Sequence, residues 1–481
     1  MREDVRFLKS LRRVLNNQKY EGVMLSNILG ANITLAYWQG VLTSKPRTKL
    51  TILFYFIYTL FIRDFYAKIR ARFIKNQVKL NKAKISHKIV LEALSSESRL
   101  QGFWYPLAKK LGIEKCVVLT PDQHCIDIDS DINFMHVDSL KLNSWLNSRV
   151  YIIRNIVRWY KKSSVLKSEF PVLNHNFQLE VILILISQIS VLEKAIFFKK
   201  EFNPKSYVSI WDWSYLGSAC CSIFNKYKIP TYTFVHGALG KRSMDEFVPL
   251  NANYVFTWGN YMSNLFIKSG VKKQHVLTVG IQRVERYVAL KESEIFELKR
   301  KFKIMSHKTV ILLAFTAVIS KQWVKNVIEL IKGFPDFRFI IRPHPSTLPN
   351  TITDLFPVFN NVIILSAGQV SLKDSIDISD VVVVESSTAG FDALIQQKPV
   401  FVLDSLANPQ FHDIMIDAID CGAVKLCTTA SELGNYFKNA DYKRDTDSDI
   451  AKNRDVFVND YIDSYGNWAV KKIEIALLAN N

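Results

Sequence analysis

The stretch Val381-Val-Val-Val-Glu-Ser-Ser-Thr-Ala-Gly-Phe-Asp-Ala-Leu394 gives the clearest indication of how this chain folds. Four consecutive valines are typical of a strand that is buried on both faces of a parallel sheet. Polar residues follow the valines, and an apolar segment that suits a helix follows the polar residues. A buried strand that leads directly into a helix is the repeating unit of an α/β fold.

The same alternation of short apolar strands and helices extends in both directions from this stretch. Around it we expect further strands at 309–315, 337–342, 362–365 and 400–403. An earlier series has expected strands at 88–94, 115–120, 207–211, 231–235, 253–258 and 275–279 and helices near 142–168 and 177–199. The charged segment 291–303 separates the two series. We therefore predict an α/β protein with two Rossmann-like domains facing a cleft.

The composition excludes several other classes of protein. Of the 481 residues, 48% are hydrophobic and only 17 are glycine and 14 proline, which excludes a disordered chain and a collagen-like fibre. The six cysteines form no C-x-x-C pair, so we expect buried thiols in a reducing cytosol. The charged N-terminus has no apolar region followed by a cleavage site, and we predict no signal peptide.

The positive charge is concentrated near the start of the chain. Residues 1–110 contain 21 Lys and Arg against 6 Asp and Glu, which is +15 of the total charge of +19. Within them, the uncharged apolar run 50–62 is 13 residues long, which is shorter than the roughly 20 that a membrane-spanning helix needs. Basic residues flank this run throughout 45–84, so we favour a helix lying on an anionic membrane. The alternative is a buried helix with solvated flanks; a nucleic-acid partner is not expected, because interleaved stacking aromatics are not evident.

Polar residues gather after three of the expected strands, where parallel sheets bind their ligands. The start of the helix after the four valines has free N–H groups and hydroxyls that suit a nucleotide phosphate, and a carboxylate one turn further on that suits a ribose. The alternative for the hydroxyls is an ordinary helix cap. The residues concerned are Glu385, Ser386, Ser387, Thr388, Gly390 and Asp392.

Two other strand ends carry candidate residues. Arg342 and His344, the latter between two prolines, suit binding or protonation of a phosphate leaving group. In the first series, His236 is a candidate general base beside the permissive Gly237, and Asp212 is a competing base. We expect three further residues near the cleft: Trp258, Gly259 and Gly280.

Other ligand motifs do not fit the sequence. It has no P-loop and no G-x-G-x-x-G after a strand, which leaves these routes to ATP or NAD unsupported. The acidic run 127–131 resembles the start of a calcium loop, but Ile132 stands where that loop needs glycine. We therefore expect no metal site.

Taken in order, these residues resemble the GT-B glycosyltransferases of bacterial surface polysaccharide assembly, over roughly 205–405. The resemblance rests on His236-Gly237, Arg342-Pro343-His344-Pro345, Ser386-Ser387-Thr388 with Asp392, and Lys398-Pro399-Val400. The nearest groups are the CDP-glycerol glycerophosphotransferases (teichoic-acid polymerases) and capsule polysaccharide transferases. The bacterial sialyltransferases, which use CMP-sugars, share a His-Pro and a Ser-Ser pair, matched here by His344-Pro345 and Ser386-Ser387. Two departures leave the donor open. Ala238-Leu239 follows His236-Gly237 where the polymerases have Thr-Pro, and the sequence has no acidic pair followed by glycine, which the sialyltransferases use as their base.

The resemblance implies a metal-independent transferase that needs no cofactor. His344, Ser386 and Ser387 would hold the phosphate of a nucleotide-activated donor, which the resemblance implies is CMP- or CDP-linked, and His236 would serve the acceptor. The acceptor would be a lipid-linked capsule or lipopolysaccharide glycan, and the enzyme would be cytoplasmic and peripheral on the inner membrane face. The expected segments are a basic N-terminal extension (1–84), an acceptor domain (85–290), a nucleotide-donor domain (300–450) and a C-terminal helix packing back on the first domain (451–481).

Two rival functions remain open. A nucleotide-sugar 2-epimerase uses the same architecture with a soluble substrate, which gives no reason for a basic apolar N-terminal segment. A non-catalytic glycan- or membrane-binding scaffold would retain the two domains without turnover. Incubation with a UDP-sugar and no acceptor separates the epimerase from the transferase. Thermal stabilisation by a nucleotide separates both enzymes from the scaffold.

Overall fold

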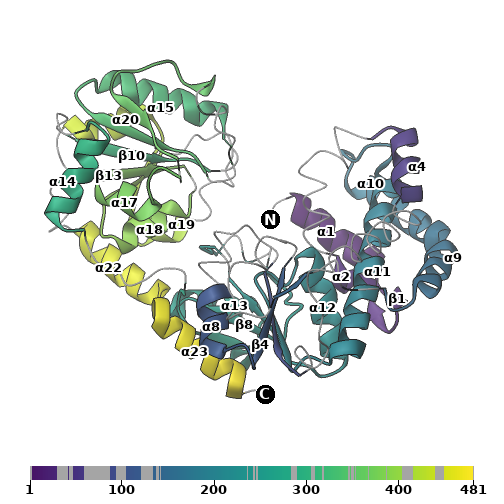
Figure 1. Ribbon diagram of the computed structural model, residues 1–481. Helices are drawn as coiled ribbons and strands as arrows, with labels where there is room; N and C mark the ends of the chain where they lie inside the picture. The colour runs from purple at the N-terminus through teal and green to yellow at the C-terminus, as the bar shows by residue number, and fades with distance from the viewer. Residues whose placement is uncertain are drawn as a thin grey trace.

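The structure is a computed structural model in which two α/β domains lie side by side (Figure 1). It describes residues 3–29, 42, 47–58, 87–93, 104–120, 134–136, 140, 142–235, 237–241, 244, 247–282, 290–304, 309–316, 319–344, 347, 352, 354–366, 368–385, 387–403, 415–438 and 449–479. The predicted His236 and Ser386 and the whole of 59–86 lie outside these residues.

The first domain is built on a parallel sheet of seven strands in the order β5-β4-β3-β6-β7-β8-β9. The strands are β3 (Ile89–Glu92), β4 (Cys116–Thr120), β5 (Phe134–His136), β6 (Ser206–Ser209), β7 (Thr231–Phe234), β8 (Tyr254–Thr257) and β9 (Val276–Thr278). The chain reverses its direction of growth between β3 and β6, which is the topological switch point of a Rossmann-like sheet.

Helices cover the two faces of this sheet. The helices of this domain are α8 (Tyr105–Leu111), α9 (Trp145–Ser164), α10 (Leu166–Glu169), α11 (Phe177–Phe202), α12 (Tyr215–Lys226) and α13 (Asn260–Lys268), with a short 3₁₀ helix at Lys273–His275. Helix α9 packs against α11, and α10 packs against α9. Of the helices in the described residues, only α11 is long and apolar enough to cross a membrane, and 78% of its most apolar window is buried. The helix expected near 177–199 is thus present and largely buried in the first domain.

The start of the chain packs into the first domain. It forms α1 (Glu3–Val14), the hairpin β1 (Lys19–Tyr20) and β2 (Val23–Met24), α2 (Leu25–Ile28) and α4 (Lys49–Ile57). Phe7, Leu8 and Leu11 of α1 are fully buried in one apolar core with residues of α11 and α12. The expectation of a separate extension over 1–84 therefore needs correction for 3–29, because these apolar side chains complete the core of the first domain.

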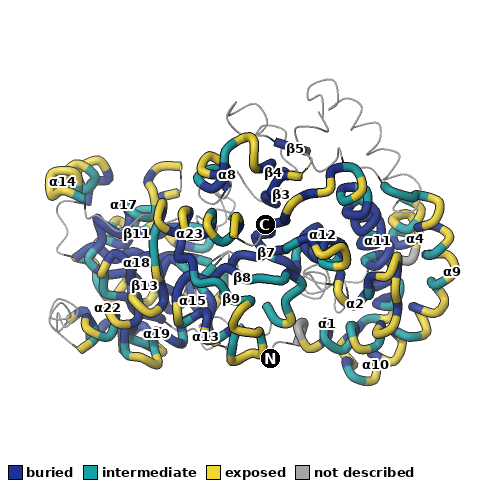
Figure 2. The backbone as a smooth tube through the Cα atoms, turned by 90° about the horizontal axis from the view of Figure 1, so that it is seen from below, coloured by how far each residue is buried: buried dark blue, intermediate teal, exposed yellow. Residues whose placement is uncertain are grey.

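The second domain repeats the pattern with six parallel strands in the order β12-β11-β10-β13-β14-β15. The strands are β10 (Val310–Ala314), β11 (Arg338–Arg342), β12 (Val362–Ile364), β13 (Val381–Val384), β14 (Val400–Leu403) and β15 (Lys425–Cys427). Its helices are α14 (Glu292–Lys301), α15 (Lys321–Gly333), α17 (Leu372–Asp377), α18 (Ala389–Ile395), α19 (Ile416–Asp420) and α20 (Ala430–Lys438). The strands of both sheets are largely buried beneath these helices (Figure 2).

The four consecutive valines Val381–Val384 form β13 and are fully buried. The charged segment 291–303 is mostly the exposed helix α14. Two parallel Rossmann-like sheets are thus present, and the predicted fold class is confirmed.

The C-terminal segment joins the two domains through α22 (Asp449–Tyr461) and α23 (Gly466–Ala479) (Figure 1). Phe457 and Tyr461 of α22 belong to an apolar core that contains residues of both domains. Val470, Ile473 and Leu477 of α23 pack with Leu107 and Leu111 of α8 in the first domain. The chain therefore returns to the first domain in two helices rather than one.

Candidate functional site

Three neighbouring strands of the second sheet end at the same edge. Ala314 of β10 pairs with Arg342 of β11 on one side and with Val384 of β13 on the other. The residues that follow these strands, His344 and Glu385 among them, consequently lie at one carboxyl edge. This edge includes the switch point between β10 and β13, where open α/β sheets bind their ligands.

Only some of the polar residues after β13 form hydrogen bonds at the start of α18. Glu385 is buried, and its Oε1 accepts a hydrogen bond of 3.0 Å from the hydroxyl of Ser320, which also caps α15. The hydroxyl of Ser387 accepts a hydrogen bond of 3.3 Å from the N–H of Ala389. Thr388 precedes α18 and its side chain makes no capping hydrogen bond. The capping alternative therefore accounts for Ser387 and leaves the hydroxyl of Thr388 outside the cap.

Gly390 and Asp392 lie in the first turn of α18. A Cβ atom on Gly390 would stand 2.9 Å from the terminal methyl of Met415, so glycine allows Met415 to pack there. Asp392 is buried and its N–H donates to the carbonyl of Thr388 over 3.3 Å. These positions fix α18 close to the edge of the sheet.

Arg342 and His344 differ in their surroundings. The Nη1 of Arg342 donates to the carbonyl of Val370 and to the hydroxyl of Ser375, both over 3.0 Å. Burial lowers the pKa of the Arg342 guanidinium. Arg342 therefore anchors α17 to the sheet, whereas His344 is only half-buried and its carbonyl accepts a hydrogen bond of 2.8 Å from Thr347.

The first domain approaches this edge through the loop that follows β7. A Cβ atom added to Gly237 would lie 4.0 Å from the Cγ2 methyl of Thr388, so this loop of the first domain lies close to the residue that precedes α18. The loop is held by Leu239, whose N–H donates to the Tyr461 hydroxyl over 2.6 Å and whose carbonyl accepts from it over 2.8 Å. The N–H of Lys241 donates to Oδ2 of Asp417 over 2.9 Å. The structure thus brings Gly237 together with the residues after β13.

Trp258, Gly259 and Gly280 lie at the C-terminal crossover instead. The indole N–H of the buried Trp258 donates to the carbonyl of Val235 over 2.9 Å. A Cβ atom would stand 2.4 Å from the backbone of Tyr461 at Gly259 and 2.1 Å from the carbonyl oxygen of Ser464 at Gly280, where φ is +94°. These residues allow the crossover to pack closely, and we correct the expectation that they line the site.

Asp212 is fully buried at the carboxyl side of the first sheet. Its Oδ2 accepts hydrogen bonds from the N–H groups of Asn251 and Ala252, the latter over 2.9 Å. Burial raises the pKa of Asp212 to about 6. The carboxylate orders the 251–252 backbone, and we do not retain Asp212 as the general base.

Glu92, the last residue of β3, is a buried polar residue that was not among the predicted site residues. Glu92 is fully buried at the switch point of the first sheet, where it accepts hydrogen bonds from the hydroxyl of Tyr207 and, over 2.9 Å, from that of Ser214. Burial raises its pKa to about 7, and the charge of Asp212 contributes. A single carboxylate at the end of an apolar strand was the signal in the sequence.

No cluster of three His, Cys, Asp or Glu side chains that could hold a metal ion occurs among the described residues. The site therefore offers hydroxyl, carboxylate and imidazole groups at the edge of the second sheet, opposite the loop that follows β7. Such an arrangement suits recognition of a phosphate-bearing, hydroxyl-rich ligand.

Sequence comparison places the chain in no known group: no family model matches it, and no curated protein matches its sequence. Solved structures do match its fold. A putative UDP-N-acetylglucosamine 2-epimerase from Listeria monocytogenes is 12% identical, with a TM-score of 0.50 over 82% of this chain and 96% of that one.

Two further structures resemble it over the same 82% of the chain. The UDP-GlcNAc 2-epimerase from Neisseria meningitidis, bound to UDP-GlcNAc, is 16% identical, with a TM-score of 0.49 over 100% of its own chain. A glycosyltransferase from Rickettsia africae is 13% identical, with a TM-score of 0.48 over 100% of its own chain. The paired Rossmann-like sheets and the Listeria structure together show that this chain has the GT-B fold.

Proposed function

We propose that the protein is a GT-B glycosyltransferase, or a glycerophosphotransferase-like enzyme, that uses a nucleotide-activated donor. The donor is a sugar or polyol phosphate linked to CMP or CDP, and the acceptor is a lipid-linked bacterial capsule or lipopolysaccharide glycan. The observation that carries the proposal is that Gly237 lies close to Thr388, so the loop after β7 lies beside the carboxyl edge of the second sheet.

In this proposal the second domain binds the donor. Ser386, Ser387 and Thr388 follow β13 in the sequence, and their hydroxyls would bind the donor phosphates. His344 would donate a hydrogen bond or a proton to the departing phosphate, where negative charge builds up during transfer. A buried carboxylate at Asp392 is suited to a ribose hydroxyl.

The acceptor side belongs to the first domain. His236 immediately precedes Gly237 in the sequence, so its imidazole would belong to the loop that meets Thr388. We assign it as the base that takes the proton of the acceptor hydroxyl. No metal or cofactor enters the proposal.

We further propose that the enzyme works in the cytoplasm on the inner face of the membrane. The basic, partly apolar segment 45–84 supports this location, because Lys and Arg beside an apolar run attract anionic lipid. A lipid-linked acceptor would be presented at the same surface.

A nucleotide panel and one substitution test the donor assignment. Thermal shift with CMP, CDP, UDP and GDP should show stabilisation by one of the cytidine nucleotides. His344→Ala should lower the rate of transfer by about 10²- to 10⁴-fold, which is the usual contribution of a general acid to the rate. The melting temperature should not fall. His275→Ala is the matched control, since His275 is a half-buried histidine of the first domain beside Tyr254. Full transfer by His344→Ala would refute the role of His344.

A second candidate function is a nucleotide-sugar 2-epimerase, which the likeness to the Listeria protein favours. Incubation with UDP-N-acetylglucosamine and no acceptor would then give the 2-epimer. A scaffold without catalytic activity would show neither epimerisation nor stabilisation by any of the four nucleotides.

A further inference from the structure

Helix α9 carries an apolar stripe that faces away from the core. Its inner face buries Ile152 and Trp159 in the first domain. Its outer face repeats apolar residues at intervals of four and three, which places them in one row along the helix. The members of this outer stripe are all exposed, from 38% to 65%: Leu146, Val150, Ile153, Val157 and Tyr160.

Helix α4 presents a second exposed apolar surface beside α9. Leu50, Leu53 and Phe54 are 77%, 54% and 61% exposed. The start of α4 is fixed to α11, because Nδ2 of Asn176 donates to the Arg47 carbonyl over 2.9 Å and the Arg47 guanidinium lies 3.3 Å from the Glu180 carboxylate. The position of α4 is thus set by the fold of the first domain.

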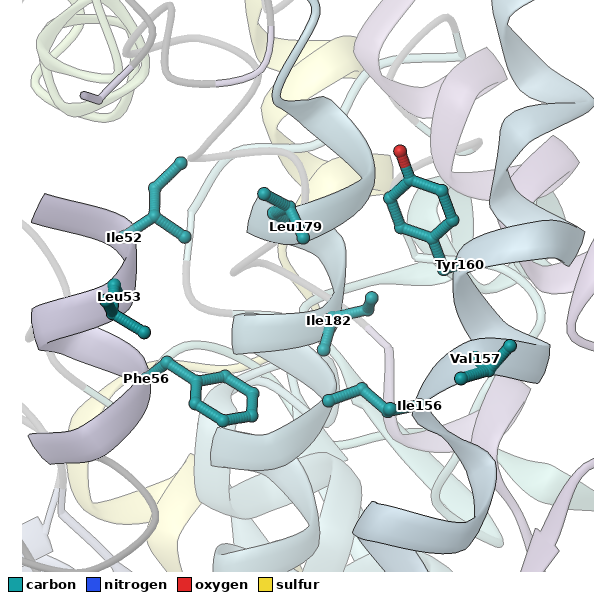
Figure 3. A pocket seen from close by; sticks show the side chains of 8 residues that line it. All are labelled: Ile52, Leu53, Phe56, Ile156, Val157, Tyr160, Leu179 and Ile182. Atoms are coloured by element: carbon teal, nitrogen blue, oxygen red, sulfur yellow. The ribbon is translucent and has the colours of Figure 1, made fainter. Parts of the chain in front are cut away.

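An apolar groove of about 390 Å³ separates the two helices, with α11 as its floor (Figure 3). Side chains of α4 and α9 face each other across it, and the hydroxyl of Tyr160 is the polar group among the side chains of its lining. The lining residues are Ile52, Leu53, Phe56, Ile156, Val157, Tyr160, Leu179 and Ile182. Together with the outer stripe of α9 and the exposed residues of α4, they form what we call the α4–α9 surface.

The charged residues of α4 and α9 themselves are all basic. Residues 47–58 and 142–164 contain no Asp or Glu. Arg154, Arg158 and Lys161 are exposed beside the apolar stripe of α9. An apolar stripe with a basic border is the pattern of a helix that lies in the headgroup region of an anionic bilayer. Two copies of this surface would bring like charges together, which disfavours a dimer.

We propose that the α4–α9 surface docks on an anionic bilayer and that a lipid hydrocarbon chain enters its groove. The proposal deepens the membrane association suggested above by assigning the contact to α9, which begins about 60 residues beyond the basic segment 45–84 in the sequence. In Figure 1, α4 and α9 lie at the end of the first domain that is remote from the second domain. Docking through this end would leave the second domain clear of the lipid.

The test measures co-sedimentation of the full chain with vesicles of equal phosphatidylglycerol and phosphatidylcholine. Val157→Glu should weaken vesicle binding by about tenfold, because residue 157 would no longer place an apolar side chain in the bilayer. Val456→Glu on α22 is the matched control, since both valines are exposed on helices, at 61% and 69%, and it should leave binding unchanged. Replacing both Arg154 and Arg158 by Gln should weaken binding by about fivefold for each charge, and only when phosphatidylglycerol is present.

Entry of a hydrocarbon chain is tested separately. Phe56→Trp places an indole in the wall of the groove, and acyl chains brominated near the headgroup should quench the added fluorescence. Unquenched emission from vesicle-bound protein would overturn this part of the proposal.

Three results would overturn the docking surface. The first is that the unsubstituted chain does not bind the vesicles. The second is that Val157→Glu binds them as well as the unsubstituted chain does. The third is that the unsubstituted chain associates with itself instead of binding vesicles, and that Val157→Glu abolishes this self-association. Because none of these measurements involves turnover, a failure of the proposed transfer reaction would leave them unaffected.

Discussion

Replacing Gly259 by alanine tests how tightly the C-terminal crossover is packed. Gly259 has extended backbone angles (φ −158°), so alanine is not strained there by its own conformation. The added methyl would nevertheless stand 2.4 Å from the carbonyl carbon and oxygen of Tyr461. Both are backbone atoms, and they can give way only if the crossover moves.

The expected cost follows from this overlap. Overpacking in a dense interior costs about 1–3 kcal/mol, and the upper end applies because backbone must move rather than a flexible side chain. We therefore expect Gly259→Ala to lower the free energy of unfolding by about 3 kcal/mol. Local opening of 459–463 should become more frequent by a factor of about 100, which corresponds to the same free energy.

Urea denaturation and amide hydrogen exchange measure these two quantities. The N–H of Ile462, which donates to Val458 over 2.9 Å, is a suitable local probe. Gly333→Ala is the control, because a Cβ atom there meets nothing within 4 Å and the backbone needs no positive φ. It should be neutral or stabilising by up to about 1 kcal/mol. A loss below about 0.5 kcal/mol for Gly259→Ala, with unchanged exchange, would refute the close-packing argument.

Two further predictions concern buried polar groups. Tyr461→Phe leaves the N–H and the carbonyl of Leu239 without their partner, so unfolding by urea should show a loss of about 2–4 kcal/mol; an undiminished stability would mean that the loop finds other partners. Burial raises the pKa of Glu92 from 4.5 to about 7, so the folded protein holds this proton over a range in which the unfolded chain has lost it. The contribution of Glu92 to stability therefore falls as the pH rises from about 4.5 to 7, on the order of 3 kcal/mol. Glu92→Gln should remove that part of the pH dependence in parallel urea titrations, and identical pH profiles would contradict the raised pKa.

The sequence was informative where a strand is buried on both faces. Val381–Val384 could be predicted because four consecutive valines suit a central parallel strand, in which every side chain is buried. The short edge strands β5 and β15 escaped prediction, because three residues are too few to show a periodicity. The helical expectation near 142–168 holds for α9, but periodicity alone did not reveal that this helix has two apolar faces.

The site was harder to predict than the fold. Polar residues after strands were correctly placed at carboxyl edges, yet their roles depend on partners that are distant in the sequence. Arg342 is engaged by Val370 and Ser375, and Gly259 by Tyr461 some 200 residues later. Such contacts follow from tertiary packing and leave no local pattern in the sequence.

The return of α23 to the first domain has a consequence for biosynthesis. Leu107 and Leu111 of α8 pack against Ile473 and Leu477, so one face of the first domain is completed only by the last helix of the chain. Ribosomes add about 5–20 residues per second, and roughly 190 residues separate the end of the first domain from this helix. The emerging first domain consequently exposes an apolar face for about 10–40 s, a period in which a chaperone can bind and the nascent chain is vulnerable to aggregation.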